Sequence, residues 1–382
     1  MKIALFVAGD KNIFFPAVVA LSSIDKSNPT VFDLYICFNG NDLTAEMQEV
    51  LDYYNIRFIP EKDLEKFGSI ENLPLMKEGK WPSEIFLNWV LPKYFDAAGY
   101  RISIKADYDL LGIAPYDISE IDPGEKILSG LAFDVNFEKE GVSKELLDSW
   151  ERRGIYRKGI RSYINAGFVV FNNKAYSEFD FYNKLKDVFV EVVNKCPGVK
   201  LAEQVAAAIV LASVGVKEVP SAYNQRVLWG SFVDEKLLPD IKNVHYITSS
   251  KPWRPFDRKL VPYFVKNRQA IIFSYRAIWL AKASENPWFS KFCTEQPLTL
   301  EQMLGLNIIV CHRYNLRIVE LEKELVEAKK NQSGDHSKDA AKTPLLELEQ
   351  ANKRILQLEA ALGRKVLENE ILKESFDASA KM

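Results

Sequence analysis

Short apolar runs alternate with longer helical runs through the first 260 residues, and this alternation restricts the fold more than any other feature. The first apolar run ends at a Gly9-Asp10 turn, and turn-forming residues also close the second strand-like run. Strands that alternate with helices form a mostly parallel sheet with helices on both faces. We therefore predict an α/β fold, with strands at residues 2–8, 32–38, 56–59 and 100–104 and helices at 14–23, 45–54 and 84–95.

The charges nearly cancel, with 50 Lys and Arg against 52 Asp and Glu. Nucleic-acid-binding domains carry a strongly basic balance, so we predict no nucleic-acid partner. The chain has four cysteines and no CxxC pair, which is typical of a protein in a reducing compartment. One long apolar run, residues 205–214, is shorter than the ~20 residues of a membrane span. We expect a cytoplasmic protein.

The pattern changes near Pro262, which divides the chain into predicted parts at 1–261, 262–310 and 311–382. The middle part is basic and aromatic, with five Lys and Arg up to Cys293 against a single acid. Two interpretations stay open for it. It forms an ordinary amphipathic helix that caps the sheet, or it lies on an anionic membrane surface and inserts Trp279, Trp288, Phe289 and Phe292.

The last part has the apolar spacing of a coiled coil. Apolar residues repeat at intervals of three and four from Cys311 to Ala328 and again from Leu348 to Leu362. A polar stretch near 331–343 separates the two and is expected to be a flexible break. We predict a homo-oligomer held together by this coiled coil. The alternative is a single charged helix that lies against its own domain.

Two carboxylates come directly after the predicted strand at 100–104. Asp107 and Asp109 are separated by one residue, so an extended backbone can point both the same way and let them hold a hard divalent cation. In an open α/β sheet, ligands bind outside the carboxyl ends of the strands, where Asp10 and Asn12 are also expected. An isolated Asp-x-Asp is more often a solvated turn.

Three further segments strengthen the prediction of a site. Asn165-Ala166-Gly167 leads into an apolar strand, where Gly167 permits close backbone approach and Asn165 offers both a donor and an acceptor. Glu203-Gln204 opens a helix of small apolar residues. His245 is followed by hydroxyl residues and then by Lys251, which suits a phosphate, although a lone histidine is often only a core residue.

These motifs, in this order, resemble the retaining glycosyltransferases of family 8, of the galactosyltransferase and glycogenin type. The resemblance covers roughly residues 1–260 and rests on four motifs, namely Asp107-x-Asp109, Asn165-Ala-Gly167, Gln204, and His245 with Lys251-Pro-Trp253. It implies a nucleotide-sugar-binding domain of the GT-A type, followed here by the helical and coiled-coil extension.

The resemblance also implies roles for individual residues. Asp107, Asp109 and His245 would ligate Mn2+ (or Mg2+), and the imidazole nitrogen favours Mn2+. Contacts to the UDP-sugar donor would come from Ala8, Asp10 and Asn12 at the base and ribose, Asp107 through the metal, Lys251 at the diphosphate, and Asn165, Gly167 and Asp134 at the sugar. Gln204 would lie beneath the anomeric carbon.

The implied activity is metal-dependent, retaining transfer of a hexose or hexose derivative from a UDP-sugar to a saccharide or lipid-linked acceptor, as in polysaccharide biosynthesis. Gln204 is neutral and a poor nucleophile, so we expect front-face attack by the acceptor hydroxyl, with the departing phosphate as base. Adjacent helix residues point about 100° apart, so Glu203 and Gln204 cannot face the sugar equally.

Two other functions compete with this one. Lys105 and Asn88 depart from the family's usual residues and keep open a catalytically lapsed scaffold that recruits partners through its coiled coil. A nicotinamide oxidoreductase would need G-x-G-x-x-G after the first strand, which shows Gly9 alone.

Overall fold

The computed structural model describes residues 2–39, 42–68, 73, 83–226, 241–247, 251–254 and 271–293. The chain forms two compact units, the first comprising Met1–Arg254 with Glu285–Thr294 and the second comprising Pro255–Ser284 with Glu295–Met382. Only helix α10 (Ile271–Ser284) is described in the second unit. The predicted coiled coil at 311–382 and its break at 331–343 lie outside the described residues.

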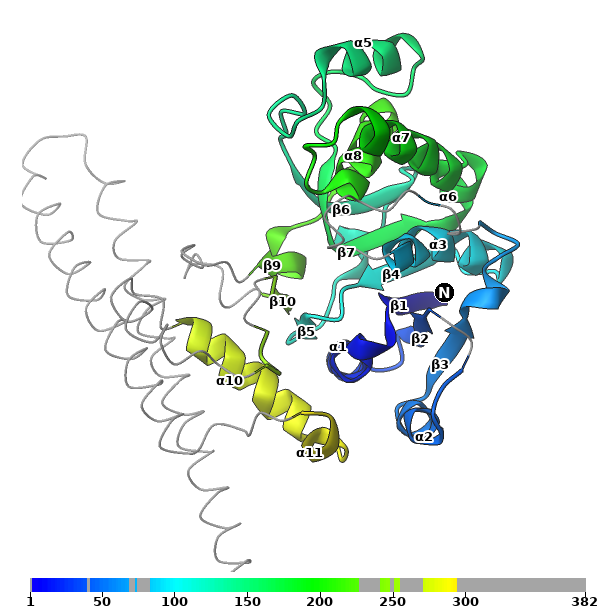
Figure 1. The fold of residues 1–382 in the computed structure, drawn as a ribbon. Coiled ribbons are helices and arrows are strands. Elements are labelled where there is room, and N and C mark those ends of the chain that lie inside the picture. Colours follow the sequence, from blue (N-terminus) through cyan, green and yellow to red (C-terminus); the bar gives the residue numbers. More distant parts are fainter. Residues whose placement is uncertain are drawn as a thin grey trace, which may run out of the picture. The chain divides into compact units, whose positions relative to one another are not determined.

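The first unit is built on a sheet of seven strands in the order β3-β2-β1-β4-β7-β6-β8 (Figure 1). Its strands are β1 (Ile3–Gly9), β2 (Phe32–Phe38), β3 (Ile56–Pro60), β4 (Ile102–Ala106), β6 (Leu128–Phe133), β7 (Tyr163–Asn172) and β8 (Lys217–Glu218). The helices of the first unit are α1 (Phe14–Ser27), α2 (Ala45–Tyr53), α3 (Leu87–Ala97), α4 (Ile118–Ile121), α5 (Lys144–Arg152), α6 (Asn173–Glu178), α7 (Phe181–Lys195), α8 (Ala202–Val214) and α11 (Phe289–Phe292), with 3-10 turns at η1 (Lys11–Ile13), η2 (Glu61–Asp63), η3 (Ser83–Phe86) and η4 (Ser221–Asn224).

The predicted α/β fold with a mostly parallel sheet is confirmed. Strands β3, β2, β1 and β4 are parallel to one another, and β7 runs antiparallel to its neighbours β4 and β6. The four predicted strands are present, although β4 begins at Ile102, two residues later than expected. That shift arises because the backbone N–H of Tyr100 donates to Phe95 O at 2.9 Å, which keeps this residue in the turn that ends α3.

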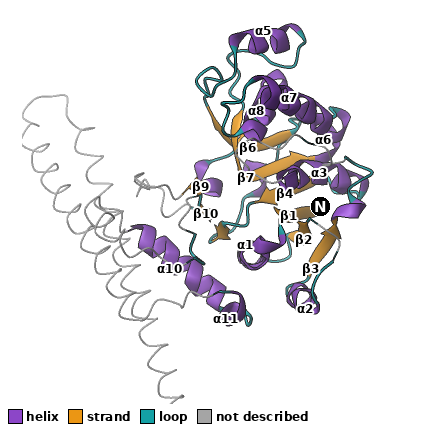
Figure 2. Ribbon diagram, in the orientation of Figure 1, coloured by secondary structure: helices purple, strands orange, loops and turns teal. Residues whose placement is uncertain are grey.

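Helices cover both faces of the sheet (Figure 2). Ala4, Phe6 and Ala8 of β1 belong to one apolar core with residues of α3, α7 and α8, and α1 packs on the other face of β1 and β2. Helix α8 is apolar on all sides and almost wholly buried, as expected for a helix inside the core. The core thus fixes α8, and with it Glu203 and Gln204 in its first turn.

Because β7 runs antiparallel to β4, its first residues lie at the edge of the sheet where β4 ends. Ala106, the last residue of β4, pairs with Phe168 in the middle of β7, so the first half of β7 extends beyond the end of β4. A motif at the start of β7 therefore lies beside a motif at the end of β4. A second sheet, β5-β10-β9, adds β5 (Leu110–Gly112), β10 (Asn243–His245) and β9 (Gln225–Arg226), with His245 opposite Leu110.

The segment 285–293 packs on the outer side of α1 and α2. The ring of Phe292 stacks on Phe15 at 5.5 Å, and Phe289 lies 6.3 Å from Phe15 and is buried. Glu285 pairs with Lys26 at 2.8 Å, and Lys291 pairs with Glu46. Three of the four aromatic residues considered for membrane insertion thus pack within this unit, since the ring of Trp288 also lies 5.4 Å from that of Tyr53. No helix among the described residues is long and apolar enough to cross a bilayer.

Phe289→Ala should therefore destabilise the first unit. Removing a buried phenylalanine ring costs about 3 kcal/mol, so we expect a lower melting temperature and faster proteolysis around residues 285–293. The control is Ser290→Ala at an exposed neighbour, which should leave both unchanged. Equal stability of the two variants would show that this segment does not hold to α1 in solution.

Candidate metal centre and active site

The turn after β4 carries the two aspartates. The backbone N–H of Asp107 donates to Gly167 O at 2.8 Å, and the N–H of Leu110 donates to Asp107 O at 3.1 Å. These bonds tie the turn to β7 at one end and to β5 at the other. Asp109 is buried, and Asp107 is partly exposed.

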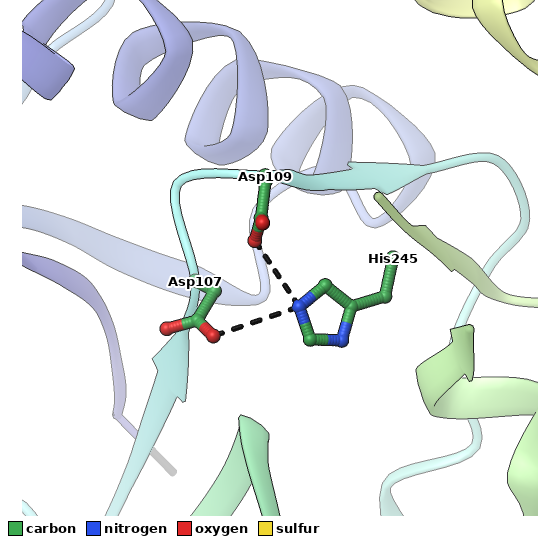
Figure 3. Close-up of side chains that lie close together, drawn as sticks. All are labelled: Asp107, Asp109 and His245. Carbon is green, nitrogen blue, oxygen red and sulfur yellow. Dashed lines mark ion pairs between the residues drawn. The ribbon is translucent and has the colours of Figure 1, made fainter. Parts of the chain in front are cut away.

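The second sheet brings His245 to the aspartates. Its Nε2 lies 3.1 Å from Asp109 Oδ1 and 3.6 Å from Asp107 Oδ2 (Figure 3). A ligand atom from each residue lies within 4.8 Å of the other two, a spacing at which one ion could be held. The structure therefore unites the three residues predicted as metal ligands, although 136 positions separate Asp109 from His245 (245 − 109).

One buried carboxylate oxygen of this cluster accepts no hydrogen bond, although His245 Nε2 lies 3.1 Å from it. Asp109 Oδ1 is buried and accepts no hydrogen bond of good geometry. Leaving a buried carboxylate oxygen unpaired is costly, so such an atom indicates a missing ligand. Two carboxylate oxygens and one imidazole nitrogen form a donor set that could hold a divalent cation.

Two lysines occupy the remaining carboxylate oxygens. Lys105 Nζ donates to Asp107 Oδ1 and to Ala166 O. Lys251 Nζ donates to Asp109 Oδ2 and, at 2.6 Å, to Tyr246 O. Each lysine binds the oxygen that faces away from His245, which leaves one oxygen of each carboxylate for a cation.

The same contacts set the ionisation of the cluster. Burial raises the pKa of Asp107, but Lys105 and His245 outweigh it, so the net pKa lies well below the usual range. Burial likewise raises the pKa of Asp109, but the lowering by His245 and Lys251 is larger, so its net pKa is also below the usual value. For His245, burial lowers the pKa while the two aspartates raise it, with a net increase. Both carboxylates are thus charged and ready to bind a cation at neutral pH.

Gly167 is required by His245 itself. A Cβ at this position would overlap the imidazole ring. The sequence predicts a close approach at Gly167, and the structure shows that the ring of His245 makes it. Asn165 lies beside it and accepts a hydrogen bond from the N–H of Gly167 at 3.0 Å.

The first turn of α8 separates its two polar residues, as expected. Gln204 is partly exposed and accepts a hydrogen bond from the Tyr163 hydroxyl at 3.3 Å. Glu203 points into the core, where the indole N–H of Trp89 donates to it. Burial raises the pKa of Glu203 to about 7, against smaller lowering effects of Trp89 and Lys105.

The residues predicted to contact the nucleotide lie at the end of β1 and in the turn that follows it. Ala8 is buried near the end of the strand, and Asp10 caps the turn η1 by accepting a hydrogen bond from Asn12 N–H at 2.6 Å. Because β1 and β4 are parallel neighbours, their carboxyl ends share one edge of the sheet. The contacts of Ala8, Asp10 and Asn12 with a nucleotide stay a prediction.

Asp134 is the predicted site residue with the weakest structural connection to the cluster. It lies just after β6, its side chain is 92% exposed, and its carboxylate pairs with Arg161 at 3.8 Å. Arg161 also pairs with Glu218 at 2.8 Å. Within the described residues, no hydrogen bond or ion pair joins Asp134 to the metal cluster.

Two residues of the site make contacts that were not predicted from the sequence, although the segment 223–225 resembles a family segment near the acceptor. The ring of Tyr108 lies 5.8 Å from that of Trp253, and Lys251 Nζ is 5.7 Å from the Tyr108 centroid. Burial, then Asp109 and Asp107, raises the pKa of Tyr108. Asn224 contacts His245 directly. The position of Tyr108 inside the Asp-x-Asp motif was a signal for the former, but Asn224 depends on a long-range contact.

Glu203→Gln should change how stability depends on pH. The unfolded chain ionises this carboxyl near 4.5 and the folded chain near 7, so between these values unfolding releases a proton. The free energy of unfolding of the wild type therefore falls as pH rises through this window. At about 1.4 kcal/mol per pH unit, the loss is on the order of 3 kcal/mol.

Gln204 and the metal cluster are unchanged in this variant, so thermal denaturation at pH 5 and pH 8 isolates the effect. We expect the melting temperature of Glu203→Gln, relative to wild type, to be higher at pH 8 than at pH 5. If the difference in melting temperature between Glu203→Gln and the wild type is the same at both pH values, the pKa of Glu203 is not raised in the folded protein.

Comparison with known proteins identifies a family for this chain. The family model described as glycosyl transferase family 8 matches residues 4–256. Among solved structures, the chain is similar to the WbbM bifunctional glycosyltransferase (15% identity, TM-score 0.49, covering 76% of this chain and 51% of that one). It is also similar to the galactosyltransferase LgtC in complex with donor and acceptor sugar analogues (16% identity, TM-score 0.47, covering 76% of this chain and 100% of that one). A third similar structure is GlyE of Streptococcus pneumoniae TIGR4 (19% identity, TM-score 0.45, covering 78% of this chain and 66% of that one).

The chain thus spans about half the length of the WbbM structure. No curated protein matches it significantly. The family model alone covers well over half of the chain, including all three residues of the Asp107-Asp109-His245 cluster. The protein belongs to glycosyl transferase family 8.

Proposed function

We propose that this protein is a metal-dependent, retaining glycosyltransferase that moves a hexose or hexose derivative from a UDP-sugar to a saccharide or lipid-linked acceptor. The observation that carries the proposal is the cluster of Asp107, Asp109 and His245 at the carboxyl edge of the sheet, within a chain of glycosyl transferase family 8. Mn2+ is the favoured ion, with Mg2+ as the alternative.

The charges of the cluster suit a diphosphate. Asp107 and Asp109 carry two negative charges, and Lys105 and Lys251 carry two positive charges in contact with them. A divalent cation held by the aspartates and His245 would leave an excess of positive charge and would stabilise the negative charge that grows on the leaving diphosphate. Lys251 adds a second cation beside that position.

Asn165 is suited to donate a hydrogen bond to the donor sugar. Its Oδ1 already accepts hydrogen bonds from Gly167 N–H and from Asn224 Nδ2, at 3.0 and 2.8 Å. Its amide nitrogen is therefore the group that can meet a sugar hydroxyl. In the proposed complex Ala8, Asp10 and Asn12 contact the base and ribose, and Asp134 leaves Arg161 to bind a sugar hydroxyl.

Gln204 is proposed to lie beneath the anomeric carbon. Its side chain is partly exposed and held by Tyr163, whereas the carboxylate of Glu203 is buried against Trp89. This arrangement removes the neighbouring carboxylate as a nucleophile and supports front-face attack by the acceptor hydroxyl. The proton of that hydroxyl then passes to the departing phosphate oxygen.

The remaining parts of the proposal concern assembly and location. We infer a cytoplasmic enzyme of polysaccharide biosynthesis that self-associates through a coiled coil at 311–382. The basic segment 262–310 offers a contact with an anionic membrane surface. The competing hypothesis is a lapsed scaffold that keeps the fold and uses the coiled coil to recruit partners.

Asp109→Asn tests the metal site. The variant keeps the shape of the side chain but loses a charged ligand, so Mn2+-dependent release of UDP from UDP-sugars should fall by at least about 100-fold. Stabilisation by UDP with Mn2+, which mass action demands of a working site, should also disappear in thermal shift. The control is Asp52→Asn on the exposed side of α2.

The two hypotheses give opposite results in this experiment. A lapsed scaffold shows neither turnover of any UDP-sugar nor Mn2+-linked stabilisation by UDP in the wild type. Full activity of Asp109→Asn would instead exclude Asp109 as a metal ligand.

Gln204→Ala tests the catalytic position. We expect transfer to slow about 10- to 100-fold while the affinity for UDP with Mn2+ stays unchanged, because the side chain is proposed to meet the sugar and not the nucleotide. Tyr163→Phe, which removes only the hydroxyl contact to Gln204, should have a smaller effect. The assigned role is falsified if Gln204→Ala retains full transfer at unchanged donor binding.

A further inference from the structure

A row of polar side chains runs behind the metal cluster from β7 to β10. The N–H of Gly167 donates to Asn165 Oδ1 at 3.0 Å, and Asn224 Nδ2 donates to the same oxygen at 2.8 Å. On its other side, Asn224 Oδ1 lies 2.8 Å from His245 Nδ1. The row thus links the proposed sugar-binding residue to a proposed metal ligand.

The direction of every hydrogen bond in this row is determined by its first member. A backbone N–H can only donate, so the atom of Asn165 that faces it is the oxygen. An oxygen can only accept, so Asn224 turns its NH2 group toward Asn165 and its oxygen toward His245. The Nδ1 atom of His245 must therefore carry a proton.

This protonation has a consequence for the other ring nitrogen. A neutral imidazole protonated at Nδ1 has a lone pair at Nε2, the atom that faces Asp107 and Asp109. Metal-bound histidines usually hold their second nitrogen in such a hydrogen bond, which fixes both the tautomer and the ring orientation.

The surroundings of Asn224 leave few alternatives to this arrangement. Asn224 is 1% exposed and His245 is 3% exposed, so bulk water cannot easily replace either hydrogen bond. Asn224 ends the turn η4 and directly precedes β9, which pairs in parallel with β10 through Gln225 and Val244. The backbone on both sides of the Asn224–His245 contact is therefore held by the small sheet.

We propose that Asn224 is a positioning residue that prepares His245 for metal binding and at the same time aims Asn165 at the donor sugar. The inference rests on the proposed metal and donor site. It adds that the buried amide of Asn224 couples the metal site to the sugar site, because its oxygen accepts a hydrogen bond from His245 and its nitrogen donates one to Asn165.

Two substitutions separate the effect on the metal site from the effect on the sugar site. Asn224→Asp keeps an acceptor for His245 Nδ1 but places an oxygen against Asn165 Oδ1, so it should spare metal binding and disturb the sugar side. We expect Mn2+ to bind at least as tightly as to wild type, with turnover of UDP-sugar reduced about 10-fold or more. Asn224→Leu removes both contacts and should weaken Mn2+ binding about 10- to 100-fold as well.

Asn173 provides the matched control. It is another fully buried asparagine, at the start of α6, where it accepts from Ser103 Oγ at 2.6 Å and donates to Tyr100 O at 2.8 Å, near the start of β4 and not at the end that leads to Asp107. Asn173→Leu should lower the melting temperature as Asn224→Leu does, but leave the affinity for Mn2+ unchanged.

The experiment titrates Mn2+ alone into each full-length variant and measures the free ion by electron paramagnetic resonance, and then measures kinetics with UDP-sugar. Wild-type affinity in Asn224→Leu, or equal weakening in Asn173→Leu, overturns the inference while the proposed function stands. A wild-type protein that binds no Mn2+ overturns the metal site and the inference together. If Asn224→Leu does not fold, Asn224→Asp still tests the inference. Loss of Mn2+ binding in Asn224→Asp, or turnover equal to that of the wild type, would overturn it.

Discussion

The close approach of two carboxylates to one imidazole is the constraint on which the rest of the site depends. Asp107 and Asp109 both lie within 4 Å of His245 Nε2, and Asp109 is buried. Like charges in a poorly hydrated place repel each other strongly unless cations or hydrogen-bond donors compensate them. The surroundings of the pair supply this compensation through Lys105 and Lys251, each on a separate carboxylate oxygen.

The topology of the sheet explains how distant segments meet here. A parallel sheet gathers the turns after β1 and β4 at one edge, and the antiparallel β7 brings its own first residues to that same edge. The small sheet then pairs β10 with β5, which begins directly after Asp109. Each of the recognised motifs thus lies at a strand or helix end that this arrangement directs to one place.

The sequence predicted those parts of the fold and site that rest on local patterns. Alternating runs indicated the parallel sheet, and Asp107, Asp109 and His245 were identified from short motifs. The contact of Asn224 with His245 and the bond of Lys105 to Ala166 O were not predicted, because they join residues that are far apart in the chain. The same reason applies to Phe289, whose burial against Phe15 no nearby residue indicates.

Lys105 illustrates why a departure from a family pattern need not mean loss of function. From the sequence, Lys105 departs from the family's usual residue, and this departure kept the hypothesis of a catalytically lapsed scaffold open. The structure instead places its Nζ on Asp107 Oδ1 and Ala166 O, so Asp107 Oδ2 still faces His245. Lys105 thereby keeps Asp107 ionised and ties it to the segment that carries Asn165 and Gly167. In this geometry the lysine supports the proposed metal site, because it neutralises charge without taking the oxygen that a cation would use.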